Sequence, residues 1–339
     1  MHDASIKPRS DISDALQKKH GFKRLGVPLF GSFSKSQINN MALRNTKRLT
    51  KQDLVFWQYP NYTNQPAYLE ETYISYIHRQ QAKVIAILHD IDYLRGWQNA
   101  RPQNLDYFDG FISTSKALTQ ILRSWGIKVP IVEMGPFTYL TQYRSPTYFS
   151  KNVYYCGSMY TWKTSFLQKI DFPLYVYGTW DSRIFLSSKV HILGSVDSNI
   201  LEQKLNKGFG LVWDDEINKK ANIKPYLYYN WPYKLSLYIS CDLPVICQKG
   251  TNVGNYVDKY QIGYTVKSLD EINRILAKTN IKDYSKMLRN IAKLRSGVVD
   301  GDNIWLAVRK IIPPVVKQTA SPIDVKVELR NGIIIIIAE

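Results

Sequence analysis

YLYYNWPYKLSLYISCDLPVICQ, residues 226–248, carries the clearest local signals in this chain of 339 residues. Pro232 fits the first position of a helix, where its missing N–H costs nothing. Apolar residues follow at helical spacing, and Pro244 marks the point by which the helix has ended. Val245-Ile246-Cys247 then indicates a short buried strand. The stretch therefore predicts a helix that leads into a core strand, the repeating unit of an α/β protein.

Lys234 lies in the first turn of this predicted helix. A cation there opposes the positive end of the helix dipole, unless a bound anion reverses the sign of the interaction. Helix N-termini bind phosphate groups readily, and Asn230 and Tyr233 would flank the same spot. The stretch thus predicts an anion site, while an ordinary surface lysine on an amphipathic helix is the alternative.

Strands and helices alternate along the rest of the chain, which predicts parallel sheets covered on both faces. Weak periodicity over residues 136–150 indicates a linker between two α/β halves. A basic helix is expected over 34–48 and a last helix over 303–311. The expected strands are 22–30, 54–59, 84–88, 111–115 and 131–133 in the first half and 153–156, 174–177, 190–193, 210–213, 245–247 and 263–266 in the second.

The motif YNWPYKLSLYISCDLPVI, together with GFGLVWD at 208–214, resembles a family of bacterial glycosyltransferases. That family includes the glucosyltransferases that extend a GlcNAc on serine-rich adhesins, and the galactofuranosyltransferases of surface polysaccharides. The resemblance implies a GT-B fold, in which two Rossmann-like domains face a cleft and the last helix, 303–311, crosses back to the first domain. It also implies a UDP-sugar donor (UDP-glucose, UDP-GlcNAc or UDP-galactofuranose), no metal or other cofactor, and often an oligomer.

On this basis we expect an acceptor-side domain over residues 1–140 and a nucleotide-sugar domain over 141–312. The tail, 313–339, is different in character. Asn331-Gly332 is a strong hairpin signal between an alternating segment and a run of five isoleucines. We expect a β-hairpin that packs on the body of the protein or on another subunit, because an uncovered isoleucine edge would aggregate.

Ligands of doubly wound sheets bind beyond the carboxyl ends of the strands. In the second half this rule selects Gly157 and Gly178, where missing side chains let backbone N–H groups approach a phosphate. Lys163 falls where the resembled family carries a basic residue against the diphosphate. Tyr177 and Thr179 are the candidates to lie beside the nucleobase, although core packing is the simpler explanation for the tyrosine.

Sugar transfer needs a stabilised leaving diphosphate, a role that Lys234 and Tyr233 could fill, and a positioned acceptor hydroxyl. In the first half, His89 and Asp90 follow a buried strand and are the candidate bases. The candidates for acceptor binding are Tyr59, Asn61 and Asp92. For each of these residues, the alternative is a solvent-exposed polar side chain at the end of a strand that has no part in binding or catalysis.

Two other functional classes stay open on the residues alone. Asp90 and Asp92 form an Asp-x-Asp motif after an apolar strand, which would suit a single-domain, metal-dependent GT-A transferase. The other alternative is a catalytically idle subunit that binds a partner or nucleic acid. No zinc-ligand spacing, RNA-recognition motif or helix-turn-helix supports nucleic acid binding, so we expect none.

The chain carries 45 Lys and Arg against 28 Asp and Glu, a formal charge of +17. This excess indicates an anionic partner or surface, and it is consistent with peripheral association with the inner face of a membrane. Three cysteines without metal spacing suit a reducing cytoplasm. No apolar run approaches the ~20 residues of a membrane span. The resembled domains usually open with an apolar strand, and none is evident before Ser10, so the start is either divergent or truncated.

Overall fold

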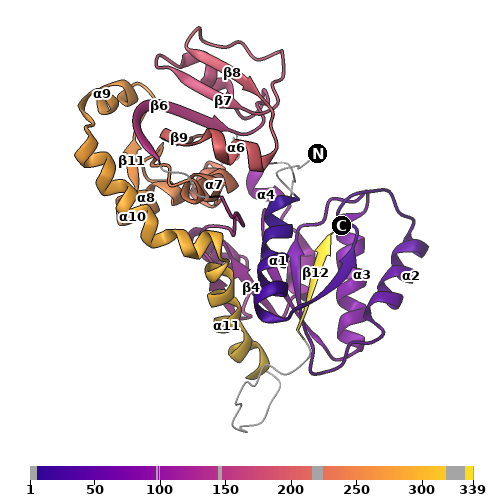
Figure 1. The fold of residues 1–339 in the computed structure, drawn as a ribbon. Coiled ribbons are helices and arrows are strands. Elements are labelled where there is room, and N and C mark those ends of the chain that lie inside the picture. Colours follow the sequence, from indigo (N-terminus) through magenta and orange to yellow (C-terminus); the bar gives the residue numbers. More distant parts are fainter. Residues whose placement is uncertain are drawn as a thin grey trace. The chain divides into compact units, whose positions relative to one another are not determined.

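The computed structural model describes residues 6–96, 98, 100–143, 147–215 and 224–317 and the backbone of 333–338. The chain divides into two compact units (Figure 1). The N-terminal unit contains Pro8–Gly135 and Asn303–Glu339, and the C-terminal unit contains Met1–Lys7 and Pro136–Asp302. The last helix thus returns to the first unit, as expected. Residues 303–312 therefore belong to the N-terminal unit, whereas the expected domain boundaries placed them in the second domain.

The N-terminal unit is built on a six-stranded sheet in the order β1-β12-β2-β3-β4-β5, with every pair parallel. Its strands are β1 (Lys23–Val27), β2 (Leu54–Tyr59), β3 (Lys83–Leu88), β4 (Gly110–Ser113), β5 (Ile131–Glu133) and β12 (Ile333–Ala338). Its helices are α1 (Lys7–His20), α2 (Lys35–Thr46), α3 (Pro66–Arg79), α4 (Asp92–Arg95), α5 (Lys116–Ser124), α11 (Asp302–Lys317) and the 3₁₀ helix η1 (Gln103–Tyr107). Every residue of β2 is buried, as a parallel sheet covered on both faces requires.

Helix α11 packs onto this sheet and fixes the last helix to the N-terminal unit. A Cβ placed at Gly110 of β4 would lie 2.9 Å from Cγ2 of Val315, so only glycine allows the helix to come this close. At the other end of the helix, the ring of Trp305 stacks on His20 of α1 with centroids 3.6 Å apart. The helix continues through Pro313 and Pro314, beyond its expected end at Ile311.

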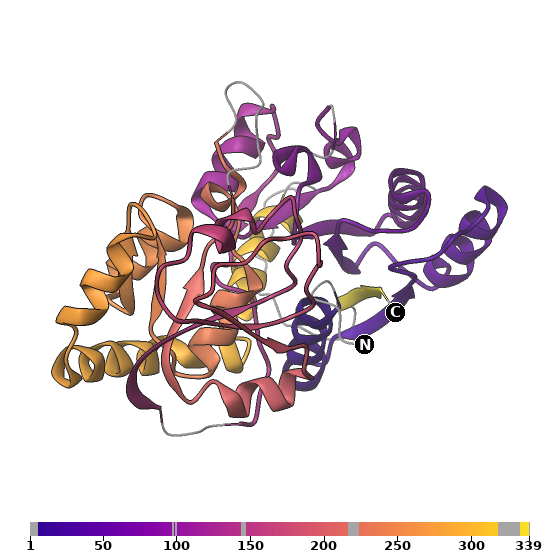
Figure 2. The same ribbon diagram turned by 90° about the horizontal axis from the view of Figure 1, so that it is seen from above.

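The expected tail hairpin is wrong. Residues 333–338 do form a strand, but β12 pairs in parallel with β1 on one side and with β2 on the other. Figures 1 and 2 show this strand, in yellow, beside β1 within the sheet. Both of its edges are therefore occupied, and none is left for the antiparallel partner that a hairpin needs. The proposed first strand of the hairpin, residues 325–329, lies outside the described residues.

The C-terminal unit holds a second parallel sheet in the order β11-β10-β9-β6-β7-β8. Its strands are β6 (Tyr148–Cys156), β7 (Leu174–Tyr177), β8 (Val190–Gly194), β9 (Lys207–Val212), β10 (Val245–Gln248) and β11 (Gly263–Val266). Its helices are α6 (Ser198–Lys204), α7 (Tyr233–Ser240), α8 (Asn252–Tyr260), α9 (Glu271–Lys278), α10 (Ile281–Val299) and the 3₁₀ helices η2 (Ser165–Lys169) and η3 (Tyr226–Tyr228). The prediction of two Rossmann-like, doubly wound domains is confirmed.

Helix α7 is the element predicted from residues 226–248, and one tyrosine fastens it to the sheet. Tyr238 lies face-on to β9, where a Cβ at Gly210 would come within 2.4 Å of its ring. Its hydroxyl accepts from the backbone N–H of Cys156, 3.0 Å away, and lies 3.2 Å from the carbonyl oxygen of Leu211. These contacts hold the first turn of α7 at the carboxyl ends of β6 and β9. Pro232 is the N-cap of the helix and not its first residue, so α7 begins one residue later than predicted, at Tyr233.

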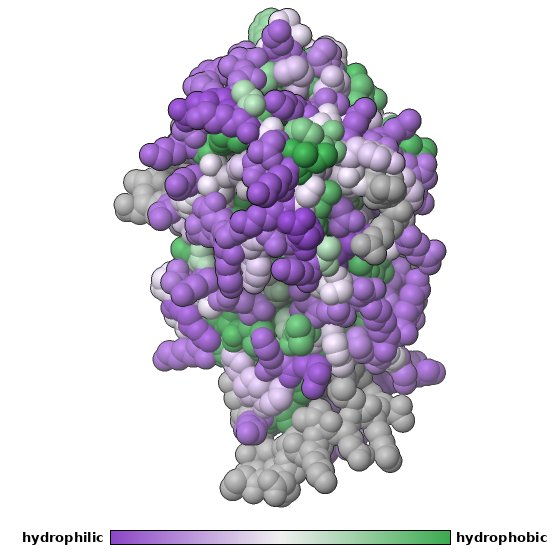
Figure 3. Space-filling model, turned by 60° about the vertical axis from the view of Figure 1, so that its left-hand side comes forward, coloured by the Kyte–Doolittle hydropathy of each residue, from purple (hydrophilic) through white to green (hydrophobic). Residues whose placement is uncertain are grey.

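Hydrophilic side chains cover most of the face shown in Figure 3, with hydrophobic ones in small separate patches. Within the described residues, no helix combines the length and the apolar character needed to cross a bilayer.

Candidate functional site

Lys234 lies in the first turn of α7 and its side chain is only 9% exposed. Its Nζ is 3.4 Å from Oδ1 of Asp214, at the end of β9, and 3.9 Å from the ring centroid of Tyr155. Burial lowers the pKa of this lysine to about 8, the Asp214 carboxylate opposes that shift, and the charge of Lys163 adds to it. The ammonium is therefore a poorly solvated cation at a helix N-terminus.

The predicted glycines lie at the same place. A Cβ at Gly157 would be 4.0 Å from Cε of Lys234, so the lysine passes directly over this glycine. A Cβ at Gly178 would come within 2.1 Å of the Gly157 carbonyl oxygen, and the φ of Gly178 is +157°. The ends of β6 and β7 are thus pressed together in a way that only glycine permits.

Asp215 positions the loop that carries Lys163. Its backbone N–H donates to the Lys163 carbonyl oxygen at 2.9 Å, and its carboxylate accepts from the N–H groups of Ser165 and Phe166. The lysine lies close enough to Lys234 to lower its pKa. Two cations on different elements therefore share one site. The strand-end rule selected this edge of the sheet, but the anchoring roles of Asp214 and Asp215 were missed because they depend on tertiary contacts.

Tyr177 and Thr179 flank Gly178 at the end of β7. The carbonyl of Tyr177 accepts from Gly157 N–H at 2.8 Å, and that of Thr179 accepts from Met159 N–H at 2.8 Å. The Tyr177 ring stacks on Tyr154 with centroids 6.4 Å apart, a packing contact within the sheet. These residues therefore join the two strand ends through their backbone.

Tyr233 and Asn230, which were predicted to flank the anion, contact other protein residues in the structure. The Tyr233 ring packs on Tyr139, with centroids 5.1 Å apart, and on Phe137. The Asn230 carbonyl accepts from the side chain of Asn252 at 3.3 Å. Both residues hold the turn before α7 in place. Among the residues that the structure describes, no group of three or more His, Cys, Asp or Glu side chains could hold a metal ion.

His89, a candidate base of the N-terminal unit, is 6% exposed. Its Nε2 lies 2.9 Å from Oε1 of Gln58. The amide nitrogen of Gln58 donates to the Arg9 carbonyl and to Oγ of Ser13, so its oxygen must be the acceptor and the histidine the donor. Burial first, and then the charge of Arg9, lower the pKa of His89 well below its usual value. It is a neutral, interior histidine that joins β3 to β2 and α1.

Asp90 is more accessible, with 23% of its side chain exposed. Arg95 of α4 donates to it at 2.5 Å, and the Tyr62 hydroxyl lies 3.5 Å away. Asp92 starts α4, and its pKa is raised by burial and then by the charge of Asp90. Because an arginine already neutralises the first carboxylate, the pair does not have the open geometry of an Asp-x-Asp metal site. Together with the two Rossmann-like units, this disfavours the GT-A alternative.

Tyr59 and Asn61 belong to a buried network around Glu70, a residue that the sequence prediction missed. Oε1 of Glu70 accepts from the Asn61 backbone N–H at 2.6 Å, and Oε2 accepts from Nδ2 of Asn104. The Tyr59 hydroxyl donates to Oδ1 of the same asparagine at 3.5 Å. Burial raises the pKa of Glu70 to about 8, although these hydrogen bonds oppose the shift. The sequence did contain a signal for this buried carboxyl group. Glu70 stands three positions before Tyr73 and therefore lies on the apolar, buried face of α3.

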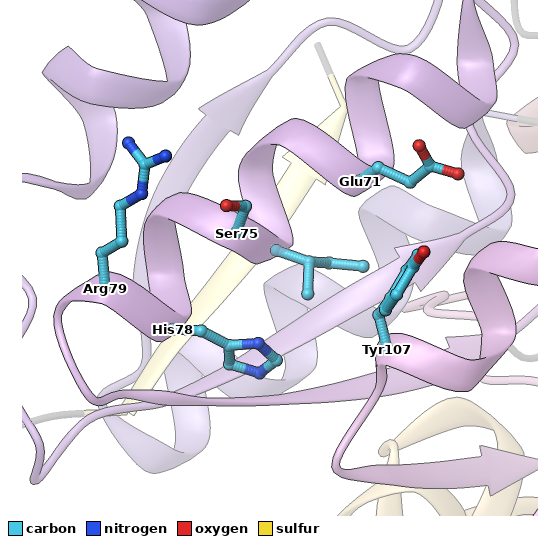
Figure 4. A pocket seen from close by; sticks show the side chains of 6 residues that line it. Glu71, Ser75, His78, Arg79 and Tyr107 are labelled. Carbon is cyan, nitrogen blue, oxygen red and sulfur yellow. The ribbon is translucent and has the colours of Figure 1, made fainter.

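A hollow of about 600 Å³ lies elsewhere in the N-terminal unit, beside α3. Figure 4 shows that Glu71, Ser75, His78 and Arg79 come from α3 and that Tyr107 faces them. Nearby, His78 and Lys83 both contact Asp109, each at 2.9 Å. Lys83 starts β3, so this hollow lies toward the amino ends of the strands, away from the predicted ligand sites.

Comparison with known proteins places both units in one family. The C-terminal domain of the glucosyltransferase 3-like family matches residues 153–311, and its N-terminal domain matches 1–136. The β-1,6-galactofuranosyltransferase WbbI of Escherichia coli K12 is 27% identical over 313 residues, which cover 87% of this chain and 91% of WbbI. Glucosyltransferase 3 of Streptococcus parasanguinis is 24% identical, over 80% of this chain and 82% of its own length.

Among solved structures, the complex of Staphylococcus aureus MnaA with UDP is 12% identical and aligns over 96% of this chain and 97% of its own, with a TM-score of 0.49. The two domain matches confirm the resemblance identified from the motif at 226–248. This chain belongs to the glucosyltransferase 3-like family of glycosyltransferases.

Proposed function

We propose that this protein transfers a hexose from a UDP-sugar to a glycan acceptor. The observation that carries the proposal is the buried Lys234 ammonium, which lies over Gly157 at the N-terminus of α7 with Lys163 close by. A desolvated cation, a helix N-terminus and a side-chain-free backbone are the three features that bind a diphosphate. The relatives are named as a galactofuranosyltransferase and a glucosyltransferase, which supports a hexosyl donor.

In the proposed reaction, the acceptor oxygen forms a bond to C1 of the sugar as the bond from C1 to the diphosphate breaks. Negative charge develops on the departing UDP, and Lys234 neutralises it in a site where little water competes. Asp214 holds the lysine in place before the donor arrives, at 3.4 Å. Lys163 would add a second positive charge to the same diphosphate. Gly178 and Thr179 would present backbone groups to the nucleoside.

The proton of the acceptor hydroxyl must pass to a base or to water. We assign this role to Asp90 rather than to His89, because Asp90 is partly exposed and His89 donates its Nε2 proton to an interior amide. Arg95 keeps Asp90 in one orientation. Asn61 and Tyr59 would support the acceptor side through the network around Glu70, and Asp92 would do so from the start of α4.

The proposal includes an acceptor on a surface protein or a lipid-linked precursor, and no metal or cofactor besides the UDP-sugar. The donor is UDP-glucose, UDP-GlcNAc or UDP-galactofuranose. We place the reaction in the cytoplasm, which the three free, buried cysteines support. The net charge of +17 favours contact with an anionic inner membrane face. The family resemblance supports a homo-oligomer, but the isoleucine run does not, because both edges of β12 are paired within the chain.

A panel of UDP-sugars tests this function, scored by UDP release and by calorimetric binding in the presence of EDTA. We expect UDP to bind with chelator present and one donor to be hydrolysed or transferred faster than the rest. Loss of turnover on chelation would overturn the metal-free mechanism. Absence of UDP binding, combined with salt-dependent binding of DNA or RNA, would support the non-catalytic alternative instead.

A further inference from the structure

The C-terminal strand β12 occupies a central position in the sheet of the N-terminal unit. Residues 334–338 pair with Lys23–Val27 of β1, and residues 333–336 pair with Leu54–Trp57 of β2. It stands second in the strand order, so it links edge strand β1 to the other four strands. The unit therefore depends on a strand that follows everything else in the chain.

The order of elements around β12 shows which position it fills. Helix α1 leads directly into β1, and the described residues begin one position before this helix, at Ile6. Parallel strands are normally joined by a crossover helix, as strand–helix–strand. Strand β12, helix α1 and strand β1 have this arrangement in space, with the first strand supplied by the other end of the sequence. This position is the one that an opening apolar strand would hold.

We propose that the gap between β1 and β2 is a strand-binding site, and that its ligand is the extended apolar segment 333–338 of the same chain. Residues 318–332 separate this segment from α11. Recognition relies on backbone hydrogen bonds along both edges, which a run of β-branched isoleucines favours. An empty gap would expose the edges of β1 and β2 and invite association between molecules.

Occupancy of this gap also bears on the acceptor side of the proposed enzyme. Strand β2 ends at Tyr59, and Gln58 next to it donates to Arg9 and Ser13 of α1. Strand β12 supports β2 along Leu54–Trp57, just before these residues. Withdrawal of β12 would loosen β2 and α1 together and would leave the C-terminal unit unaltered.

Hydrogen exchange on the full-length protein tests the proposal directly. We expect the amides of 334–338 and of β1 to exchange at least about tenfold more slowly than unstructured amides. Ile335→Pro removes a hydrogen-bond donor in the middle of β12, and should lower the melting temperature of the N-terminal unit by roughly 6–12 °C. Ile333→Pro is the matched control, because proline is tolerated at the first residue of a strand. Unprotected tail amides in the wild type would overturn the proposal.

A chain that ends at Lys317 separates this inference from the proposed function. We expect it to lose protection in β1 and β2 and to recover it when a peptide of residues 331–339, made soluble with added lysines, is supplied in trans. The same peptide with proline at 335 should fail to restore it. UDP affinity should be unchanged in all cases, because the donor residues belong to the other unit. A truncated chain with wild-type protection would refute the site, and a dimer with a concentration-dependent melting temperature would refute occupancy by the same chain.

Discussion

The sites proposed in the two units differ in the charge of three buried residues: the C-terminal unit holds a buried lysine cation, and the N-terminal unit holds a buried histidine and a buried glutamic acid that are neutral. In the C-terminal unit, Lys234 is a buried cation near a second lysine, and its Nζ lies 3.4 Å from the Asp214 carboxylate. In the N-terminal unit, burial lowers the pKa of His89 and raises the pKa of Glu70. Both residues are therefore buried in their neutral forms.

This difference shows how each edge is suited to its proposed partner. A site for a diphosphate gains from cations that have lost their water, since the ligand supplies the missing counter-charge. A site for a sugar hydroxyl gains from fixed, neutral hydrogen-bonding groups that hold loops in position. The comparison predicts which of the two proposed sites responds to changes in charge, in shape and in pH.

Lys234→Ala should give the largest effect and would break the comparison if it failed. Removal of the cation leaves the diphosphate without its main counter-charge, so UDP affinity should fall by at least about tenfold and turnover by about 10²–10³-fold. Calorimetry and UDP-release assays measure the two effects. Lys282→Ala, at an exposed position on α10, is the matched control and should behave as wild type. Equal affinities in the two variants would remove this residue from the donor site.

Gly178→Ala tests shape rather than charge at the same edge. The added Cβ would lie 2.1 Å from the Gly157 carbonyl oxygen, so the ends of β6 and β7 must separate. We expect a stability loss of about 2–4 kcal/mol and weaker UDP binding, measured by denaturant unfolding and calorimetry. Gly26→Ala in β1 is the control, because a Cβ there meets nothing within 4 Å. A variant as stable as the control would show that the close approach of the two strands is not required.

The pH dependence of UDP binding should follow the ammonium of Lys234. Its pKa of about 8 in the free protein means that the cation is present below pH 8 and is lost above it. Because the anion binds the protonated form, affinity should be level below about pH 7 and fall by up to about tenfold per pH unit above 8. Lys234→Arg keeps its charge throughout and should flatten the curve. An unchanged slope in that variant would assign the dependence to another group.

Sequence patterns located the elements of the proposed donor site because their signals are local. Helical spacing, Pro232 and two glycines directly after strands locate α7 and the ends of β6 and β7. The structure brings Gly157, Gly178 and Lys234 together at that edge. The anchoring carboxylates Asp214 and Asp215 lie where the strand-end rule points, yet their partners come from distant elements that no local pattern reveals.

The tail shows where local signals mislead. Asn331-Gly332 favours a hairpin, but the isoleucine strand instead pairs with β1 and β2, about 300 residues away in sequence. A strand that fills a gap between two strands forms hydrogen bonds along both of its edges, whereas a strand of an isolated hairpin forms them along only one. Residues before Ser10 do not have the pattern of an apolar strand, and the isoleucine run lies far from them in sequence. Only the three-dimensional pairing connects the two.

Glu70→Gln has the smallest expected effect, and it tests whether the buried Glu70 of the N-terminal unit is neutral. The folded-state pKa of Glu70, about 8, exceeds the usual value of 4.5 for a glutamic acid, so the folded protein holds this proton more tightly than the unfolded chain does. Stability of the N-terminal unit should therefore be greatest below about pH 4.5, as far as this group is concerned, and should decline as pH rises to about 8. Glutamine mimics the neutral acid and should remove that decline, raising the melting temperature at pH 8 by a few degrees. Glu71→Gln, its exposed neighbour, should leave the profile unchanged. A profile that retains its slope in Glu70→Gln would mean that the carboxylate is charged in the folded protein, and the contrast between the two edges would then rest on Lys234 and His89 alone.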